Sequence, residues 1–261
     1  MSDYIEIAAY AARKAGKYLL ENRGKISTDN IDEKGQNDFV TYVDKHSEKI
    51  IVDTLLNHFP EHNILAEEGT SRNENNEYRW IIDPLDGTKN FIQNVPFFCI
   101  SIALQKRDEI IAGVVYDPVH DELFAAEKGS GASCNNIPIQ VSSREFSQAL
   151  IATGFPFRAK HYLPKYLLTF EEIFLGCSGM RRCGSAALDL CYTAAGRCEG
   201  FWELGLSIWD IAAGSLIILE AGGKVSDFSG GKNYLETGFI TAGNDSVHKK
   251  LVQIINNRFD K

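Results

Sequence analysis

The sequence predicts a layered domain of the α/β (or α+β) class, in which helices and strands are intermixed around one or two sheets. Apolar residues recur at helical spacing in some segments, and short apolar runs between turn residues indicate strands in others. Both kinds of segment occur along the whole chain. No linker rich in Pro, Gly or Ser divides the 261 residues, so residues 1–261 are expected to form a single domain.

Helical periodicity is clear from the start of the chain, and a polar loop at 22–38 is expected to separate the first helix from the second. The helix predicted at 209–221 is apolar nearly all round, which indicates that it is buried. The apolar face of the first helix consists of Ile5, Ala8, Ala12, Ala15 and Leu19. The other predicted helices cover residues 41–58, 162–174, 185–195 and 246–259.

Strands are predicted in both halves of the chain, wherever a short apolar run lies between turn residues. A segment rich in Asn and Glu, 69–77, is expected to be a solvent-facing hairpin or loop. The predicted strands cover residues 63–66, 78–82, 98–106, 109–116, 122–127, 150–153, 198–203, 225–227 and 239–242.

Charge and composition exclude several classes of protein. The chain carries 27 Lys and Arg against 35 Asp and Glu, a formal net charge of −8, which argues against direct nucleic-acid binding because basic residues hold phosphate backbones. Its six His and six Cys show no zinc-binding spacing and no C-x-x-C pair, and no apolar run reaches the ~18–20 residues of a membrane span. We therefore expect a cytoplasmic protein with free thiols and no membrane contact. A phosphorylated substrate stays compatible with this charge if a cation intervenes.

The most informative pattern is Trp-Ile-Ile-Asp-Pro-Leu-Asp-Gly-Thr-Lys-Asn-Phe at 80–91. A hydrophobic strand is expected to end in Asp83, and the chain then turns at Pro84 and brings Asp86 beside Asp83. Two carboxylates about 4 Å apart repel by ~4 kcal/mol at an effective dielectric near ~20, so such a pair shares a proton or binds a cation. Gly87 allows close backbone approach, and Thr88 can open a short helical turn that faces an anion. An Asx-type turn, in which both carboxylates bind local amides, explains this pattern equally well.

Other acidic residues at the ends of elements favour a metal. Glu67 and Glu68 follow the strand at 63–66, and Asp210 stands at the head of the buried helix, where taken alone it would be a helix cap. Carboxylates without His or thiol partners indicate hard oxygen ligation, hence Mg²⁺ or Mn²⁺. A carboxylate-bound Mg²⁺ usually keeps waters and takes a substrate phosphate as a further ligand.

These motifs resemble those of the inositol monophosphatase family, and the resemblance runs from about Ile5 to Phe259. The segment 83–91 is similar to the first signature of that family, and 209–214 with 220–223 is similar to the second. Two acidic stretches that precede the signatures in the family match 37–44 and 66–69.

Two further segments resemble the bacterial inositol-1-monophosphatase branch of the family. They are Ala-Thr-Gly-Phe-Pro-Phe at 152–157 and Arg-Arg-Cys-Gly-Ser-Ala-Ala-Leu-Asp at 181–189. The resemblance implies a layered α-β-α-β-α sandwich of the sugar-phosphatase type, usually a homodimer, whose activity depends on Mg²⁺ and is inhibited by lithium.

The resemblance also implies two or three Mg²⁺ in each active site. One is held by Glu67, Asp83 and the main-chain carbonyl of Leu85. Asp83, Asp86 and Asp210 hold a second, and Glu67 with waters holds a third.

The other roles implied by the resemblance concern the attacking water and the substrate. Asp44 and Thr88 resemble the pair that orients and deprotonates the water, so Asp44, Glu67 and Thr88 form the implied catalytic group. Lys34 matches a mobile loop lysine near the metals. Implied substrate contacts are Leu85, Asp86, Gly87, Thr88, Arg182, Gly184, Ser185, Ala186, Glu203 and Asp210.

Taken alone, three of these residues have simpler interpretations. Asp44 has the spacing of a capping-box partner to Thr41, and Lys34 has the character of a solvated loop lysine. Arg182, next to another arginine, could equally belong to a surface charge pair or a dimer contact.

The implied reaction is the hydrolysis of inositol 1-phosphate and other myo-inositol monophosphates by metal-activated water. Related alternatives are a phosphatase acting on a nucleotide 3′-phosphate, fructose bisphosphate or histidinol phosphate. A different alternative is a binding partner of the bacterial transcription machinery. The phosphatase fold that uses Asp-x-Asp-x-Thr is disfavoured by the spacing Asp-x-x-Asp-Gly-Thr, and the chain contains neither a P-loop nor a G-x-S-x-G elbow.

Overall fold

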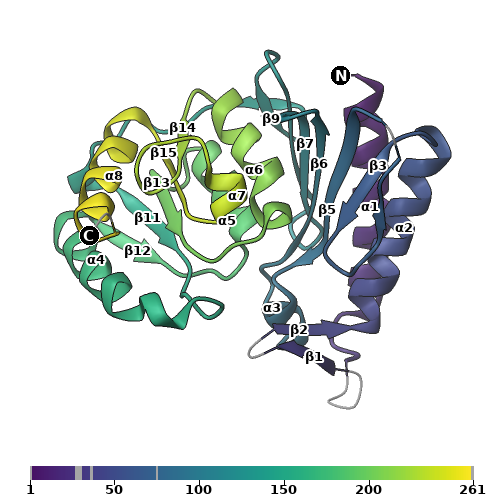
Figure 1. Ribbon diagram of the computed structural model, residues 1–261, viewed down its shortest axis with the longest axis horizontal. Helices are drawn as coiled ribbons and strands as arrows, with labels where there is room; N and C mark the ends of the chain where they lie inside the picture. Colours follow the sequence, from purple (N-terminus) through teal and green to yellow (C-terminus); the bar gives the residue numbers. More distant parts are fainter. Residues whose placement is uncertain (1, 27–30, 36–37, 75, 260–261) are drawn as a thin grey trace.

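Five alternating layers of helices and sheets make up the protein (Figure 1). The structure is a computed structural model that describes residues 2–26, 31–35, 38–74 and 76–259. The layers are helices α4 (Leu163–Gly176) and α8 (Asp245–Phe259), a five-stranded sheet, helices α5 (Ala186–Ala194) and α6 (Ile208–Glu220), an eight-stranded sheet, and helices α1 (Asp3–Asn22) and α2 (Tyr42–His58). The predicted α-β-α-β-α sandwich is therefore confirmed.

The larger sheet contains, in spatial order, β10 (Ile137–Ile139), β9 (Ala132–Cys134), β8 (Glu122–Glu127), β7 (Glu109–Asp117), β6 (Cys99–Lys106), β5 (Tyr78–Asp86), β3 (Asn63–Ala66) and β4 (Ser71–Arg72). Its strands β3 and β5 are parallel, whereas its other described pairs are antiparallel. The carboxyl ends of β3 and β5 therefore lie at the same edge, which is where the acidic motifs occur.

The smaller sheet contains β12 (Gly179–Arg181), β11 (Leu150–Thr153), β13 (Gly200–Glu203), β15 (Ile240–Gly243) and β14 (Lys224–Ser226). Strand β11 is parallel to both of its neighbours, and the remaining described pairs are antiparallel. The loop that follows β11 and the strand β13 both face the acidic edge of the larger sheet through the pocket described below.

Most predicted elements agree with the observed ones to within one or two residues. Strand β5 runs four residues past its predicted end, and the elements that were not predicted are short. The expected polar loop at 22–38 contains strand β1 (Ile31–Gly35), which pairs with β2 (Asp38–Thr41). The sequence pattern does not predict the three-residue strands β9, β10 and β12 or the four-residue helix α7 (Tyr234–Thr237). Such segments are too short for an apolar period to show. The predicted helical turn at Thr88 is confirmed as α3 (Thr88–Ile92).

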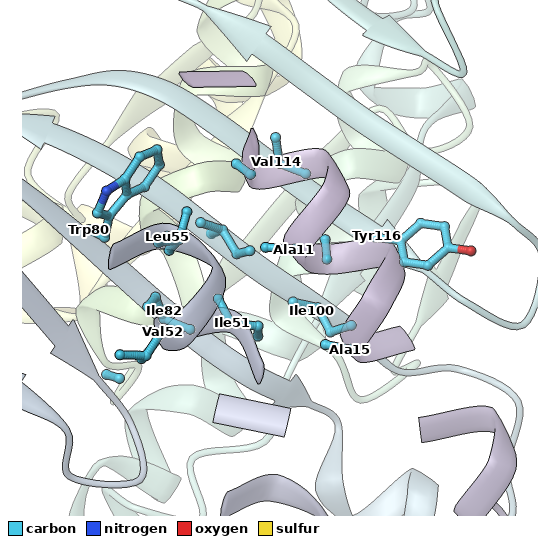
Figure 2. Packing of buried hydrophobic residues seen from close by; sticks show 14 of the residues in the cluster. Ala11, Ala15, Ile51, Val52, Leu55, Trp80, Ile82, Ile100, Val114 and Tyr116 are labelled. Carbon is cyan, nitrogen blue, oxygen red and sulfur yellow. The ribbon is translucent and has the colours of Figure 1, made fainter. Parts of the chain in front are cut away.

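Helices α1 and α2 bury their apolar faces against the larger sheet (Figure 2). Ala11 and Ala15 of α1 and Ile51 of α2 are fully buried and belong to one cluster with Trp80 of β5. The small alanine side chains allow α1 to lie close to the strands. In the described part of the chain no helix is long and apolar enough to cross a membrane.

Helix α6 lies between the two sheets, and its residues 210–218 are all buried. The burial predicted for this helix from its all-round apolar character is therefore confirmed. It approaches strand β7 closely at Gly113, where an added Cβ would lie 3.0 Å from the carbonyl oxygen and 3.1 Å from the Cα of Ala213. This close packing fixes the position of α6, whose first turn carries Asp210.

We expect Gly113→Ala to lower the free energy of unfolding by about 1–3 kcal/mol, because the added methyl overpacks against the backbone of α6. Urea denaturation followed by circular dichroism measures this change. Gly179→Ala in the edge strand β12 is the control, since its new Cβ would meet the flexible end of Leu150 at 3.3 Å. A Gly113→Ala protein as stable as the wild type would contradict the close packing.

Candidate active site

Two carboxylates of the site lie on strand β5, which is irregular at this point. Asp83 pairs with Ser101 of β6 and Asp86 pairs with Cys99, so three steps along β5 match two along β6. The extra residue forms a bulge, where a proline is tolerated, and β5 continues through Pro84 to Asp86. The predicted end of the strand at Asp83 is therefore wrong. The Asx-type interpretation holds for Asp83, because the Leu85 N–H donates to its Oδ1 at 2.9 Å.

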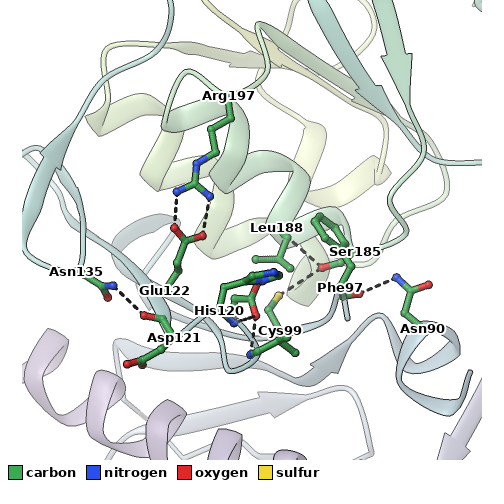
Figure 3. A network of polar contacts seen from close by, with 12 residues as sticks. Asn90, Phe97, Cys99, His120, Asp121, Glu122, Asn135, Ser185, Leu188 and Arg197 are labelled. Atoms are coloured by element: carbon green, nitrogen blue, oxygen red, sulfur yellow. Dashed lines mark hydrogen bonds and ion pairs between the residues drawn. The ribbon is translucent and has the colours of Figure 1, made fainter. Parts of the chain in front are cut away.

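Asp86 is held by the start of helix α5. Its Oδ2 accepts hydrogen bonds from the Ser185 hydroxyl at 2.6 Å and from the Ala187 N–H at 2.8 Å. The Ser185 oxygen also accepts from the Leu188 N–H at 3.4 Å and lies 3.5 Å from the Cys99 sulfur (Figure 3). These contacts join the bulge of β5 to the first turn of α5.

Asp210 reaches the same place from the first turn of α6. The Ser207 N–H donates to Asp210 Oδ2 at 2.7 Å, so the side chain stabilises the helix start while it faces the site. The Ser101 hydroxyl donates to the carbonyl of Trp209 at 3.1 Å and ties this turn to β6. One ligand atom from each of Asp83, Asp86 and Asp210 lies within 4.8 Å of the other two.

Burial and mutual repulsion raise the pKa values of the clustered carboxyls. Burial raises the pKa of Asp83 well above its ordinary value, and the charges of Glu67, Asp86 and Asp210 add to this effect. The pKa of Asp86 is raised to about 7, first by burial and then by the charge of Asp210. The metal-free site therefore holds protons that a bound divalent cation would release.

Glu67 lies beside this cluster, in the turn that follows β3. Its backbone N–H donates to the carbonyl of Ile82 at 3.1 Å, and its largely buried side chain lines the pocket. The turn is held by Glu48 of α2, which sequence reasoning missed. The two Glu48 oxygens accept from the N–H groups of Glu68 at 2.7 Å and Thr70 at 3.0 Å.

Asp44 makes the predicted capping contacts to Thr41 and also contacts Thr88, the residue with which the resemblance pairs it. Its Oδ2 accepts from the backbone N–H and the hydroxyl of Thr41 at 2.9 and 2.6 Å, which forms the capping box of α2. Its Oδ1 accepts from the Thr88 hydroxyl at 3.1 Å, and that hydroxyl also lies 3.1 Å from the Leu85 carbonyl oxygen. Burial raises the pKa of Asp44, although hydrogen bonds from Thr41 oppose the shift.

One pocket brings together most of the predicted site residues. Asp44 lies next to it through its hydrogen bond to Thr88. Lys34 belongs to strand β1, and its side chain is outside the described part of the structure. The predicted residues that line the pocket are Glu67, Asp83, Leu85, Asp86, Gly87, Thr88, Arg182, Gly184, Ser185, Ala186, Glu203 and Asp210.

Two glycines shape the wall of this pocket. Gly184 has a φ of +97°, and a Cβ there would lie 2.5 Å from Arg182 Nη1. The adjoining turn is fixed by Asn90, whose amide donates to the carbonyl of Cys183 at 2.9 Å. The same amide donates to the carbonyl of Phe97 at 2.7 Å (Figure 3). At Gly154 a Cβ would overlap the carboxylate of Glu203, so only glycine leaves room for that side chain.

Sequence reasoning predicted Arg182 but missed the aromatic rings and the other basic residues at the rim of the pocket. The Arg182 guanidinium lies 5.4 Å from the ring centre of Phe155 and 5.7 Å from that of Phe157, and Lys89 Nζ lies 4.6 Å from the ring centre of Phe157. Arg158 follows these rings in the sequence and also lines the pocket. The sequence signal for this rim was the segment 152–157, which contains Phe155 and Phe157. The segment resembles the family, but the resemblance does not indicate what these two rings contact.

Asp189 of α5, which interacts electrostatically with Asp86 and Glu203, is a further residue that sequence reasoning missed. It is buried, and burial followed by the charge of Asp86 raises its pKa well above the ordinary value. Burial and the charge of Asp189 likewise raise the pKa of Glu203. The carboxyls on both sides of the pocket therefore tend to hold protons.

Comparison with known protein families matches residues 1–258 to the inositol monophosphatase family. The chain belongs to that family. Among curated proteins it is similar to the Nus factor SuhB of Salmonella typhimurium, with 46% identity over 254 residues that cover 97% of this chain and 95% of that protein. Membership of the inositol monophosphatase family supports phosphatase activity.

Solved structures of the family share the fold. The extragenic suppressor protein SuhB of Bartonella henselae superposes with a TM-score of 0.94 and 42% identity, covering 97% of this chain and 98% of that one. The inositol monophosphatase of Anabaena gives a TM-score of 0.86 and 40% identity, covering 98% and 96%. The family is generally magnesium-dependent, and the cluster of Asp83, Asp86 and Asp210 is of the kind that holds such an ion.

The raised pKa of Asp86 predicts how the stability of the metal-free protein varies with pH. The folded form holds this proton up to about pH 7, whereas a free aspartate releases it near 3.8. The stabilisation is therefore complete below about pH 4 and is lost as the pH rises through about 7. In EDTA, we expect Asp86→Asn to have a higher Tm than the wild type at pH 8 and a similar Tm near pH 4. If the Tm values of the two proteins differed by the same amount at every pH in this range, the raised pKa of Asp86 would be contradicted.

Proposed function

We propose that the protein is a magnesium-dependent phosphomonoesterase that hydrolyses myo-inositol monophosphates, including inositol 1-phosphate, to inositol and phosphate. The observation that carries the proposal is the convergence of Asp83, Asp86 and Asp210 in one pocket. The family resemblance implies phosphate-binding amides at Gly87 and Thr88 and a polyol-binding carboxyl group at Glu203, and these three residues line this pocket.

The described carboxylates fit a divalent cation. An ion at about 2.1 Å from two oxygens allows them to be at most about 4.2 Å apart, and the three aspartates are already within 4.8 Å. Among the described contacts, hydrogen-bond donors reach Oδ1 of Asp83 and Oδ2 of Asp86, so each carboxylate has its second oxygen available for an ion. We assign one Mg²⁺ to Glu67, Asp83 and the Leu85 carbonyl, a second to Asp83, Asp86 and Asp210, and a third, where present, to Glu67 with waters.

Bound magnesium would neutralise the substrate phosphate and make a bound water more acidic. The protein's own contribution is the orientation of that water by Thr88 and Asp44. The Thr88 hydroxyl donates to Asp44 Oδ1, so its oxygen can in turn accept a hydrogen bond from water. Asp44 is fixed by Thr41, which prevents the carboxylate from rotating away.

The substrate contacts follow from the two walls of the pocket. The backbone at Gly87 and Thr88 supplies N–H groups to the phosphate, and the turn of Gly184, Ser185 and Ala186 borders the polyol. Glu203 provides a carboxyl group for polyol hydroxyls, in the space that Gly154 leaves open. Arg182, stacked on Phe155 and Phe157, adds positive charge at the rim.

We also propose that the protein is a homodimer, as the family resemblance implies. Helix α4 supports this proposal because it exposes several large apolar side chains, and it is continuous in sequence with the edge strand β12. A second copy would cover this apolar surface. The exposed apolar residues of α4 are Leu163, Leu167, Leu168, Phe174 and Leu175.

A role as a partner of the transcription machinery is the second candidate function. The name Nus factor, carried by relatives that are 46% identical, favours it. The two functions separate in a variant that folds but does not turn over substrate. A cellular phenotype that Asp86→Asn leaves unchanged would favour the partner role, whereas loss of that phenotype would favour catalysis.

Removal of the metal tests the phosphatase proposal. EDTA should abolish phosphate release and Mg²⁺ should restore it, and Glu67→Gln should lower kcat by at least ~10²-fold because it removes charge from a metal ligand.

The assay uses inositol 1-phosphate, with a nucleotide 3′-phosphate, fructose bisphosphate and histidinol phosphate for comparison. Lithium inhibition is measured by titrating LiCl in the same assay. Full activity after metal removal would refute the metal site. Faster hydrolysis of one of the other esters would show that inositol 1-phosphate is not the preferred substrate.

A second test concerns the hydroxyl of Thr88, one of the two threonine hydroxyls bonded to Asp44. Thr88→Val should lower kcat by ~10²-fold or more with a smaller change in KM, because the water loses its orienting hydroxyl. Thr88→Ser keeps the hydroxyl and should retain most of the activity. If Thr88→Val turned over substrate as fast as Thr88→Ser, the hydroxyl would have no part in the reaction.

A further inference from the structure

Arg158 places a positive charge against two of the assigned metal ligands. Its Nη2 lies 3.6 Å from Glu67 Oε1, and its Nη1 lies 3.5 Å from Asp210 Oδ2. Glu67 follows β3 of the larger sheet, Asp210 begins α6, and Arg158 follows β11 of the smaller sheet. One guanidinium therefore joins three separate segments at the pocket.

The other basic residues of the pocket are placed differently. The guanidinium of Arg182 and the ammonium of Lys89 lie over the rings of the rim. Among the ion pairs described for this pocket, those to Glu67 and Asp210 are made by Arg158. The positive charge of Arg158 also acts on Asp86, where it opposes the rise in pKa caused by burial.

By the assignment above, one divalent cation would bind Glu67 and a second would bind Asp210, which are the two carboxylates that the guanidinium faces. The guanidinium keeps its charge at any working pH, and like charges a few ångströms apart repel strongly in a partly buried site. The guanidinium and the divalent cations therefore compete for these two carboxylates.

The side chain of Arg158 is able to leave while its backbone stays in place. The side chain is 39% exposed, so it can swing toward solvent at the pocket mouth. The adjacent Ala159 is buried, and its N–H donates to the Pro156 carbonyl at 3.1 Å. A change of Arg158 conformers thus requires no movement of the fold.

We propose that Arg158 is the counter-cation of the metal-free site and competes directly with the divalent cations for Glu67 and Asp210. The proposal rests on the metal site assigned under the proposed function. Arg158 stabilises the acidic pocket before metal binds, and the affinity for metal is lowered because the guanidinium must first be displaced.

The test is isothermal titration of Mn²⁺ into the EDTA-treated and dialysed full-length protein at a fixed pH. We expect Arg158→Gln to bind Mn²⁺ roughly five- to tenfold more tightly than the wild type. We also expect its metal-free Tm to fall by about 2–4 °C, because two partly exposed ion pairs are lost. Arg158→Lys retains a charge that can reach the same carboxylates and should have a Kd close to that of the wild type.

Arg182→Gln is the matched control, since it removes the same charge from the same pocket without removing an ion pair to Glu67 or Asp210. It should bind Mn²⁺ nearly as the wild type does. An unchanged or weaker affinity in Arg158→Gln would overturn the proposal, and so would an equal gain in Arg182→Gln, which would indicate a general field effect. Absence of Mn²⁺ binding in the wild type and all variants would overturn the metal site itself, and the proposal with it.

Discussion

The candidate active site depends on holding carboxylates of like charge close together inside the protein. Each is held by a short-range donor, namely the Leu85 N–H for Asp83, Ser185 and Ala187 for Asp86, and the Ser207 N–H for Asp210. These donors fix the side chains, but they do not offset the unfavourable burial and mutual repulsion of the carboxylate charges. The pKa values of Asp83 and Asp86 therefore remain raised. The layers packed around α6 and β5 therefore keep in place a cluster that would otherwise move apart.

The starts of two helices serve both the fold and the site. Asp44 and Asp210 occupy equivalent positions in the first turns of α2 and α6, where each accepts from the backbone N–H three residues before it. A capping carboxylate has little freedom to rotate, so the same hydrogen bond that begins the helix also orients the side chain toward the pocket. A capping role and a site role are thus complementary at these positions.

Local sequence predicts the parts of the site that depend on neighbouring residues. The apolar run before Asp83 locates the strand, and the pattern after Gly87 locates the helical turn of α3. The passage of β5 through Pro84 could not be predicted, because the bulge is defined by its register with β6. Glu48 and Arg158 were missed for a related reason. Their partners lie 20 or more positions away in the sequence, and a single charged residue leaves no periodic signal.

The charges of the pocket limit how it can accept an anion. Five carboxyl groups line it (Glu67, Asp83, Asp86, Glu203 and Asp210), against the three basic side chains of Lys89, Arg158 and Arg182, which leaves a formal charge of −2 when all are ionised. A phosphate monoester brings a further charge of about −1.5 to −2 at neutral pH. Two divalent cations balance this total, whereas protonation of the carboxyls alone removes negative charge without supplying a ligand for the phosphate. An acidic protein with a net charge of −8 can therefore bind an acidic substrate, provided that the cations bind first and Arg158 gives up its carboxylate partners.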